Sequence, residues 1–519
     1  MSAIFCSCAT LPSYSEISKK RSYALPHPEQ TRLGQRFELA ERNHPGESGF
    51  RLIQAGADGF LMRMQMIAAA EHSLDLQYFI FHGDKTGKLL TEAVLKAADR
   101  GVRVRVLVDD GETEPGDEQI AALSAHPAIE IRIFNPFAYR GHFKLFKSME
   151  FLFNATRLDY RMHNKLLVVD NAIALVGGRN IGDQYFQIDP ESQFADDDVF
   201  AAGAIVQKLS ATFDEFWNCD LSIPAELLSY ELPTVSELNQ QRQLLNEEHL
   251  ELKAEGLAFV KRVTSGKPFQ DIVEGRLPIV WAQAQLIYDS PDKKQVDNGI
   301  LSGRLIHPAI MNAARTVQSE LLMVTPYLIP DEEGIQLFKN LRTHHAKILI
   351  LTNSLQSADM SVAQSGYMHY RIPLLEDGVQ LYEIRSQLGN SKGSGQSPSL
   401  SKFGHYGLHA KLYVFDRKRL FIGSMNFDQR SKHLNTEIGL IIDSPTLAQQ
   451  VAERFQSMVQ PANAYRLAIQ PNPEGGEPSL VWHTQEKGKA IVYDTEPARS
   501  DWQSLKVNVL SLLPVDDEL

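Results

Sequence analysis

Residues 161–185 read RMHNKLLVVDNAIALVGGRNIGDQY, and residues 407–431 read GLHAKLYVFDRKRLFIGSMNFDQRS. Each stretch contains His-x-Lys-x4-Asp, followed after six residues by Gly-[Gly/Ser]-x-Asn. The repeated positions are His163, Lys165, Asp170, Gly177 and Asn180 in the first copy, and His409, Lys411, Asp416, Gly423 and Asn426 in the second. Two copies with identical spacing indicate an internal duplication rather than chance.

The segments that precede the two motifs repeat each other as well. Before the first motif, apolar residues have helical spacing at 50–70 and 87–101, and strand patterns occupy 73–81 and 102–110. Before the second, the same order of helix, strand, helix and strand occupies 307–317, 319–329, 332–344 and 346–354. Strands alternating with helices predict parallel pairing with helices on the sheet faces. We therefore expect an α/β protein with two pseudo-twofold-related mixed β-sheets and one active site at their interface.

The duplication divides the chain into segments. The predicted leader, 1–48, has no clear periodicity and is either ordered late in folding or mobile. It is followed by a first domain, a helical connector, a second domain and a C-terminal extension, at 49–221, 222–300, 301–460 and 461–519.

Composition restricts the class of protein. A hydrophobic content of 43% is typical of a globular chain, and no apolar run reaches the roughly 18 to 20 residues needed to span a bilayer. The net charge of -12 argues against a general nucleic-acid binder, because such binding depends on basic residues. The three cysteines, Cys6, Cys8 and Cys219, do not form a disulfide or zinc pattern.

The spacing within each motif predicts which side chains meet. Alternation along a strand places His163 with Lys165 and His409 with Lys411, whereas Asp170 and Asp416 point the other way. The candidate catalytic set contains all six residues, but we interpret both aspartates as structural residues at turns. A tight hairpin at 170–171 would place Gly178 opposite His163, and the same register would place Ser424 opposite His409.

An imidazole, an ammonium group and an amide that converge in each half suit a phosphate group. We predict phosphate contacts from Asn180, Asn426, Ser424 and Gly178. One imidazole could attack phosphorus while the other donates a proton to the leaving oxygen, and the residues alone do not decide which does which. The second ring nitrogen of a catalytic histidine usually binds a carboxylate, for which the candidates are Asp196 or Asp198 and Glu437. No metal-ligand cluster is recognisable, and we expect no metal or other cofactor.

The duplicated motif resembles that of the phospholipase D superfamily. Further stretches, including FNPF at 134–137, FADDDV at 194–199 and the terminal LLPVDDEL, resemble bacterial cardiolipin synthases of the type without N-terminal transmembrane helices. The resemblance implies a tandem duplicated phospholipase D fold and transfer of a phosphatidyl group, through a phosphohistidine, to the glycerol hydroxyl of phosphatidylglycerol or a related acceptor. It also implies that His163 is the nucleophile and His409 the general acid and base. The chain has Gly178 where the second copy has Ser424, which leaves the first half without a matching hydroxyl.

The expected partners are phospholipids, namely phosphatidylglycerol with phosphatidylethanolamine as a second candidate, and the surface of a bacterial membrane as a peripheral site. The aromatic and basic segment 134–161 suits an anionic lipid surface, or else forms a core helix with a solvated face. A lipid anchor at Cys8 would require an upstream start. The alternative functions are hydrolysis of phospholipids to phosphatidic acid, cleavage of nucleic-acid phosphodiesters, and a non-enzymatic membrane scaffold. We expect no nucleic-acid partner, and the sequence identifies no protein partner.

Overall fold

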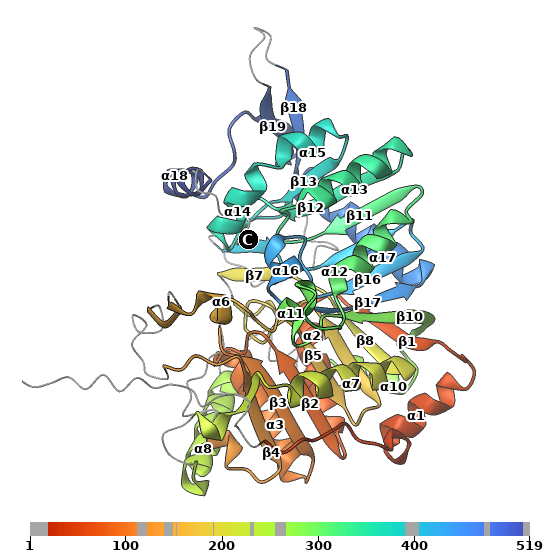
Figure 1. The fold of residues 1–519 in the computed structure, drawn as a ribbon, viewed down its shortest axis with the longest axis vertical. Helices are drawn as coiled ribbons and strands as arrows, with labels where there is room; N and C mark the ends of the chain where they lie inside the picture. The colour runs from red at the N-terminus through yellow and green to blue at the C-terminus, as the bar shows by residue number, and fades with distance from the viewer. Residues whose placement is uncertain are drawn as a thin grey trace, which may run out of the picture.

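The computed structural model describes residues 19–111, 122–139, 149–151, 153–189, 191–228, 233–254, 266–389, 404–471 and 478–511. The first half of the chain forms one lobe and the second half forms the other (Figure 1). The lobes meet along β1 (Ser48–Ile53) and β10 (Val280–Tyr288), which pair antiparallel. One continuous sheet of 18 strands therefore runs through the described part of both lobes.

The sheet order in the first lobe starts at its outer edge and ends at β1. It runs β9 (Ser222–Pro224), β4 (Ile129–Phe134), β3 (Arg103–Asp109), β2 (Ser73–Tyr78), β5 (Leu166–Val169), β6 (Ile173–Gly177), β8 (Asp198–Gly203) and β1. Strands β2, β3 and β4 are parallel and the others pair antiparallel, which confirms a mixed sheet.

The second lobe repeats this order from β10 outward. It runs β10, β17 (Ile438–Asp443), β16 (Arg419–Gly423), β15 (Leu412–Phe415), β11 (Glu320–Val324), β12 (Lys347–Asn353), β13 (Gln380–Ile384) and β18 (Ala464–Gln470), and continues with β19 (Ser479–Glu486) and β20 (Lys489–Tyr493). Equivalent strands therefore occupy equivalent places on either side of the β1–β10 pair, as a pseudo-twofold axis requires. A separate parallel pair, β7 (Ser192–Ala195) with β14 (His405–Leu408), also connects the lobes.

Helices cover both faces of the sheet. In the first lobe, α2 (Gly56–Ala69) and α3 (Lys85–Asp99) lie on one face and α7 (Ala204–Asn218) on the other. In the second lobe, α12 (Ile306–Arg315) and α13 (Glu332–Thr343) lie on one face and α17 (Pro445–Met458) on the other. The remaining helices are η2 (Pro28–Gln30), α1 (Arg32–Glu41), α6 (Ala155–Leu158), η3 (Ala225–Leu227), α8 (Val235–Ala254), α10 (Pro268–Val273), α11 (Lys293–Asp297), α14 (Ser361–Met368), α15 (Arg371–Glu376), α16 (Gln429–His433) and α18 (Asp501–Leu510).

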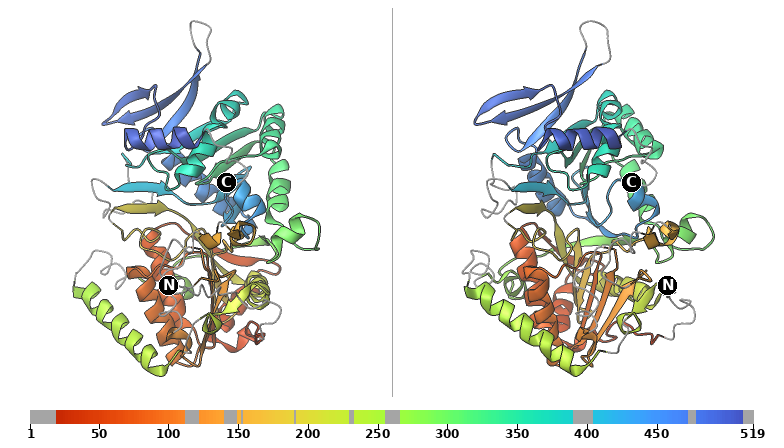
Figure 2. Two further views of the ribbon diagram at one scale, coloured as in Figure 1. Left: turned by 60° about the vertical axis from the view of Figure 1, so that its left-hand side comes forward. Right: turned by 90° about the vertical axis from the view of Figure 1, so that its left-hand side faces the viewer.

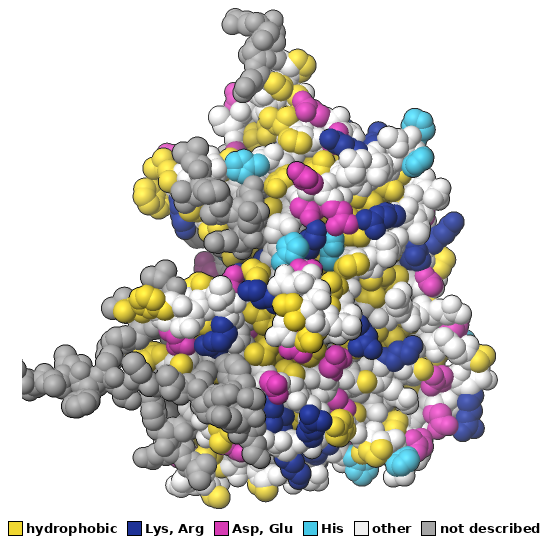
Figure 3. All heavy atoms as spheres, in the orientation of Figure 1, with side chains coloured by type: hydrophobic (Ala, Val, Ile, Leu, Met, Phe, Trp, Pro, Cys, Tyr) yellow, Lys and Arg dark blue, Asp and Glu magenta, His cyan; other side chains and the backbone are white. Residues whose placement is uncertain are grey.

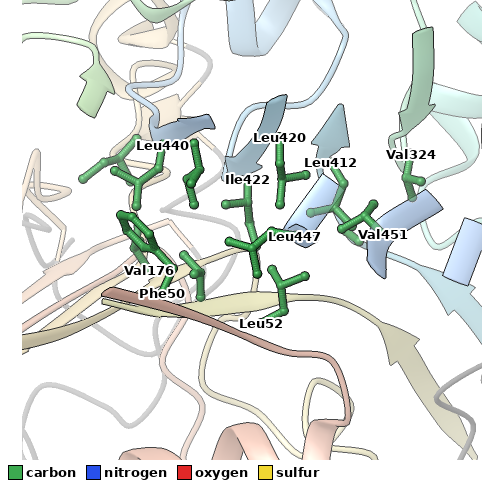
Figure 4. Packing of buried hydrophobic residues seen from close by; sticks show 14 of the residues in the cluster. Phe50, Leu52, Val176, Val324, Leu412, Leu420, Ile422, Leu440, Leu447 and Val451 are labelled. Atoms are coloured by element: carbon green, nitrogen blue, oxygen red, sulfur yellow. The ribbon is translucent and has the colours of Figure 1, made fainter. Parts of the chain in front are cut away.

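A hydrophobic core shared by both lobes fixes their relative position. Phe50 and Val176 of the first lobe belong to the same buried cluster as Ile422, Leu440 and Leu447 of the second (Figure 4). Each lobe also has a core of its own on the opposite sheet face. Burial of apolar side chains at about 25 cal/mol per Å² makes this shared core a main stabilising contribution at the interface.

Two segments differ from the sequence prediction. Residues 50–53 belong to strand β1 and not to a helix. A short apolar run fits either structure, and here the pairing with β8 and β10 decides it. The predicted connector is helical at α8, α10 and α11, but it also contains β10, which links the two lobes through β1 and β17. Figure 2 shows α8 along the edge of the first lobe, where Arg242 and His249 bind Asp99 and Glu92 of α3.

The described part of the leader is also folded. Residues 19–48 contain α1 and bind the first lobe, since the backbone N–H of Ala24 donates to Asp214 and Arg105 donates to the carbonyl of Ser22. The expectation of a mobile leader is therefore wrong for these residues. Cys8 lies outside the described residues.

The predicted hairpin register is wrong by one residue in both lobes. Leu166 pairs with Val176 and Leu412 pairs with Ile422, so each turn holds three residues instead of two. Asp170 and Asn171 have φ of 53° and 51°. Gly178 consequently does not lie opposite His163, nor Ser424 opposite His409.

Candidate active site

The first histidine lies where the two lobes touch. The backbone N–H of His163 donates to the carbonyl of Thr436 (2.9 Å), and that of Thr436 donates to the carbonyl of Arg161 (2.9 Å). This short bridge places Glu437, the next residue, beside the imidazole. The His163 Nδ1 lies 2.9 Å and 3.0 Å from the two carboxylate oxygens of Glu437.

The second histidine is held in an equivalent way by the first lobe. Strand β14 pairs with β7, and the backbone N–H of His409 donates to the carbonyl of Ala195 (2.8 Å). Asp196 follows at once, with its Oδ2 2.6 Å from His409 Nδ1. Each histidine is therefore oriented by a carboxylate from the opposite lobe, and neither motif is complete within its own repeat.

The two carboxylates have different surroundings. Glu437 accepts hydrogen bonds from the hydroxyls of Ser424 and Ser431, and its backbone N–H donates to Asp289 (2.9 Å). Asp289 in turn binds the buried ammonium group of Lys293 at 2.9 Å. Lys293 therefore supports Glu437 from the connector.

Asp196 has no serine at the equivalent position, because Gly178 occupies it. A Cβ at Gly178 would lie only 2.1 Å from Asp196 Oδ1. That oxygen accepts the backbone N–H of Asp197 at 2.7 Å. The Gly-[Gly/Ser] difference between the motifs thus leaves space for an aspartate in one lobe and supplies a donor to a glutamate in the other.

Lysines and aromatic rings complete the site. Lys165 Nζ donates to the carbonyl of His163 (2.7 Å) and lies 5.3 Å from the ring centre of Phe79. Lys411 donates to the carbonyl of His409, and its Nζ is 3.1 Å from Nε2 of that ring. Both histidines are only 6% exposed, so both imidazole rings are almost completely buried.

Burial dominates the electrostatics of the histidines. Desolvation lowers the pKa of His163 well below its usual value, and the charges of Lys165 and Lys411 lower it further. Desolvation and Lys411 also lower the pKa of His409, to about 4, against the opposing charge of Asp196. Since Lys411 acts on His163 and Lys165 acts on His409, the two half-sites share one electrostatic environment.

The carboxylates respond in opposite directions. Desolvation raises the pKa of Glu437 to about 7, although Lys165 opposes this shift. Desolvation would likewise raise the pKa of Asp196, but His409 and Lys411 outweigh it and the pKa lies below its usual value. At neutral pH the partner of His409 is therefore ionised, whereas the partner of His163 is close to its titration midpoint.

The other residues singled out in the sequence have structural contacts. Asp170 accepts the backbone N–H groups of residues 71–73, and Asp416 those of residues 318–320, so both aspartates fix turns as interpreted. Asp198 binds Arg63 (2.9 Å) and Arg179 (3.1 Å) instead of a histidine.

The two asparagines differ in their contacts. Asn180 accepts the backbone N–H of Ile80 (3.2 Å) and donates to the hydroxyl of Tyr185 (3.1 Å). The buried Oδ1 of Asn426 has no hydrogen-bond partner among the described residues. Of the two side chains, only that of Asn426 therefore has a buried acceptor oxygen without a hydrogen-bond partner in the described part of the chain.

Sequence reasoning missed several residues around the histidines. The rings of Phe79 and Tyr185 lie 5.0 Å from His163 and 5.1 Å from His409, and Phe194 lies 5.5 Å from His409. Asp289 and Lys293 were missed because the connector shows no repeat that would single them out. Phe194 could have been identified, since it stands two residues before Asp196.

Two further observations concern only the described part of the chain. It contains no group of three or more His, Cys, Asp or Glu side chains placed to hold a metal ion. Among its helices, none has the length and apolar character needed to cross a membrane. The terminal LLPVDDEL falls outside the described residues.

Comparison with known proteins identifies one family and relatives whose names agree with it. The family model described as "Cardiolipin synthase, PLD-like domain" matches residues 64–217 and 308–459. Cardiolipin synthase C of Escherichia coli (strain K12) is 36% identical over 482 residues, covering 91% of this chain and 96% of that protein. Major cardiolipin synthase ClsA of Bacillus subtilis (strain 168) is 26% identical over 427 residues, covering 81% and 71%. The phosphatidylserine synthase structure from Haemophilus influenzae Rd KW20 has a similar fold, with a TM-score of 0.52 at 12% identity over 83% of this chain and 91% of that chain.

Proposed function

The chain belongs to the cardiolipin synthase family of enzymes with phospholipase D-like domains, and on that premise we propose that it is a phosphatidyltransferase that forms cardiolipin or a close analogue. The observation that carries the proposal is the crossed arrangement of the site. Two imidazoles, each bound through Nδ1 to a carboxylate of the opposite lobe, share the charges of two buried lysines. Such a site offers a nucleophile, a proton donor and positive charge to one phosphodiester.

We assign His163 as the nucleophile. Its Nδ1–H donates to Glu437, so the lone pair lies on Nε2, which can attack phosphorus. Desolvation and the two lysines lower its pKa, which keeps the ring neutral and nucleophilic at neutral pH.

His409 is the general acid and base in this scheme. Its partner Asp196 is ionised, and a carboxylate beside Nδ1 stabilises the imidazolium form. In the free enzyme desolvation and Lys411 keep the pKa of His409 at about 4. A bound phosphate anion offsets the lysine charge, which raises this pKa and lets the ring take up the proton that it later donates.

The proposed reaction has two steps, formation and breakdown of a phosphohistidine. His163 Nε2 forms a P–N bond while the P–O bond to the leaving alcohol breaks, and the proton of His409 passes to the leaving oxygen. In the second step the hydroxyl of an acceptor phosphatidylglycerol attacks phosphorus, its proton returns to His409, and the P–N bond breaks. When phosphatidylglycerol is also the donor, the products are cardiolipin and glycerol.

Lys165 and Lys411 would bind the phosphate oxygens, and the side-chain amide nitrogen Nδ2 of Asn426 would donate a further hydrogen bond to them. Asn180 would act mainly through Tyr185, which it already binds. We assign Ser424 to the support of Glu437 and Gly178 to the space for Asp196, in place of direct phosphate contacts.

The function is tested by incubating the purified chain with phosphatidylglycerol vesicles and resolving the lipids by mass spectrometry. We expect cardiolipin and glycerol from the wild type, and neither from His163→Ala or His409→Ala. Phosphatidic acid without cardiolipin would mean that water is the acceptor, and it would reject synthesis. Adding phosphatidylethanolamine in a second arm identifies the donor lipid, and single- and double-stranded DNA and RNA at low salt test the nuclease alternative.

A further inference from the structure

We propose that two exposed apolar clusters, one on each lobe, dock the enzyme on a phospholipid bilayer with the active site between them. The first cluster is Trp502, Leu505 and Val509 on α18, and the second is Met149, Phe151 and Phe153 just before α6. We call these two clusters together the apolar rim. The inference rests on the proposed function, because it names the surface through which that site would reach its lipid.

Helix α18 presents its apolar side chains outward. Trp502, Leu505 and Val509 are 72%, 53% and 54% exposed, and their spacing of three and four residues places them on one face of the helix. Exposed Lys506 stands on the same face. Tryptophan side chains concentrate at membrane–water interfaces, and a lysine beside them can contact anionic lipid headgroups.

The opposite face of α18 is fixed to the second lobe. Val507 is buried, the side chain of Gln503 donates to the carbonyl of Leu355 (2.6 Å), and Arg499, just before the helix, donates to the carbonyl of Ala358 (2.6 Å). The helix is therefore attached to the second lobe at residues 355–358 with Trp502 facing outward.

The residues of the second lobe that bind α18 lie near the active site. Next to Ala358, the carboxylate of Asp359 accepts the hydroxyl of Tyr327 at 3.1 Å. Desolvation lowers the pKa of Lys411, and the charge of Asp359 is among those that oppose this shift. Desolvation raises the pKa of Tyr185, and the charge of Asp359 adds to that shift, so Asp359 lies within electrostatic range of the His409 half-site. Residues 355–359 therefore connect α18 to the edge of the reaction centre.

The second cluster is connected to the His163 half-site. Glu150 accepts the backbone N–H groups of Ala138 (2.7 Å) and Tyr139 (2.8 Å), and Arg157 donates to it at 3.1 Å. These contacts fix the segment that carries Phe151 and Phe153, which remain 41% and 78% exposed.

From there the contacts lead to the histidine. Phe137 packs against the guanidinium group of Arg161 (5.0 Å), and Arg161 binds Asp109, which also accepts the backbone N–H of Met162. His163 is the next residue. Each half-site thus has an exposed apolar cluster attached to its own edge.

The arrangement of the rim favours a bilayer over a protein partner. In Figure 1 α18 and α6 lie on the same side of the molecule, with β7 between them, and Figure 3 shows hydrophobic atoms gathered at both places. A membrane is flat and contacts both clusters at once, and it supplies the acyl chains of the proposed substrate. Two linked contacts also bind far more tightly than either one alone.

The test is sedimentation of the full chain with sucrose-loaded vesicles of phosphatidylglycerol and phosphatidylethanolamine. The variants are Trp502→Ser/Leu505→Ser/Val509→Ser, Phe151→Ser/Phe153→Ser and their combination. Ile300→Ser/Leu301→Ser serves as the control, because these residues are 71% and 45% exposed and lie outside the rim. We expect at least tenfold weaker binding for each rim variant, a greater loss for the combination and no change for the control.

Further measurements separate the outcomes. Thermal unfolding should match the wild type, and turnover of short-chain phosphatidylglycerol dissolved below its micelle concentration should be retained. Unchanged vesicle binding by the combined variant would overturn the docking proposal while leaving the proposed function intact. Rim-dependent binding by a wild type that forms no cardiolipin would overturn the proposed function instead. A wild-type dimer that the rim substitutions dissociate, without loss of vesicle binding, would make the rim a contact between two copies and overturn the docking proposal.

Discussion

Substituting Gly178 by alanine should inactivate the enzyme by displacing Asp196. The added Cβ would lie 2.1 Å from Asp196 Oδ1, whereas such contacts are essentially never below 3.0 Å. The carboxylate must therefore retreat by about 1 Å, which stretches its 2.6 Å contact with His409 to the limit of a hydrogen bond. Asp196 is fully buried and also held by the backbone N–H of Asp197, so it has no alternative position that keeps both contacts.

The magnitude follows from the contact that is lost. A hydrogen bond to a charged group contributes about 1.5–3 kcal/mol, so kcat should fall by roughly 10- to 150-fold. Gly59→Ala is the matched control, because its Cβ would make only ordinary contacts of 3.5 Å with Arg179 and lies inside a helix. That variant should keep full activity and gain up to about 1 kcal/mol of stability.

The assay is cardiolipin formation in mixed micelles, with unfolding followed in parallel to detect damage to the fold. A double-mutant cycle with Asp196→Ala isolates the mechanism, since both substitutions break the same contact and their effects should not add. Full activity of Gly178→Ala, or losses that multiply in the double variant, would refute the assignment of Asp196.

Three other predictions follow from the same network. Ser424→Ala removes a hydroxyl donor from Glu437 and should lower kcat about tenfold, whereas unchanged kcat would reject the support role. Burial raises the pKa of Glu437 from 4.5 to about 7. Between pH 4.5 and pH 7 the folded protein therefore binds more protons at this group than the unfolded chain does, and its contribution to the free energy of unfolding falls as the pH rises. Across that pH range, the free energy of unfolding of Glu437→Gln should therefore rise relative to wild type by up to about 1.4 kcal/mol per pH unit. Urea titrations at several pH values measure this difference, and a difference that does not change with pH would contradict the prediction. Lys293→Met leaves Asp289 buried without its cation and should cost about 3–5 kcal/mol, which Asp289→Asn in the same chain should partly restore.

The duplicated motif was enough to single out the two histidines that the structure places at the boundary between the lobes, and the apolar spacing before each motif predicted the repeated strand–helix order. Strands β2, β3, β11 and β12 fall where the alternation of apolar residues placed them. Glu437, and Asp196 with Asp198 as its alternative, could also be identified as candidate histidine partners, because they follow their motifs at similar intervals. Such local signals depend on residues close together in the chain.

What could not be predicted depends on contacts between distant segments. The exchange of carboxylates between lobes follows from two short bridges, at Met162 with Thr436 and at His409 with Ala195, and no local pattern specifies them. The one-residue error in register arose because each turn holds three residues and not the two that were predicted. In the first lobe the turn residue Asp170 accepts backbone N–H groups of the segment that precedes β2, and this long-range contact cannot be read from the hairpin sequence. Residues of β10 were assigned to a helical connector because pairing with both lobes, and not local preference, makes them a strand.

The assignment of roles within the crossed site is tested most directly by locating the covalent intermediate. Wild-type enzyme mixed with phosphatidylglycerol, quenched in alkali within one turnover and digested, should carry the phosphatidyl group on the peptide that contains His163. His163→Ala should carry none. An adduct on the His409 peptide would reverse the assignment, and rapid turnover with no adduct on either histidine would contradict the two-step mechanism.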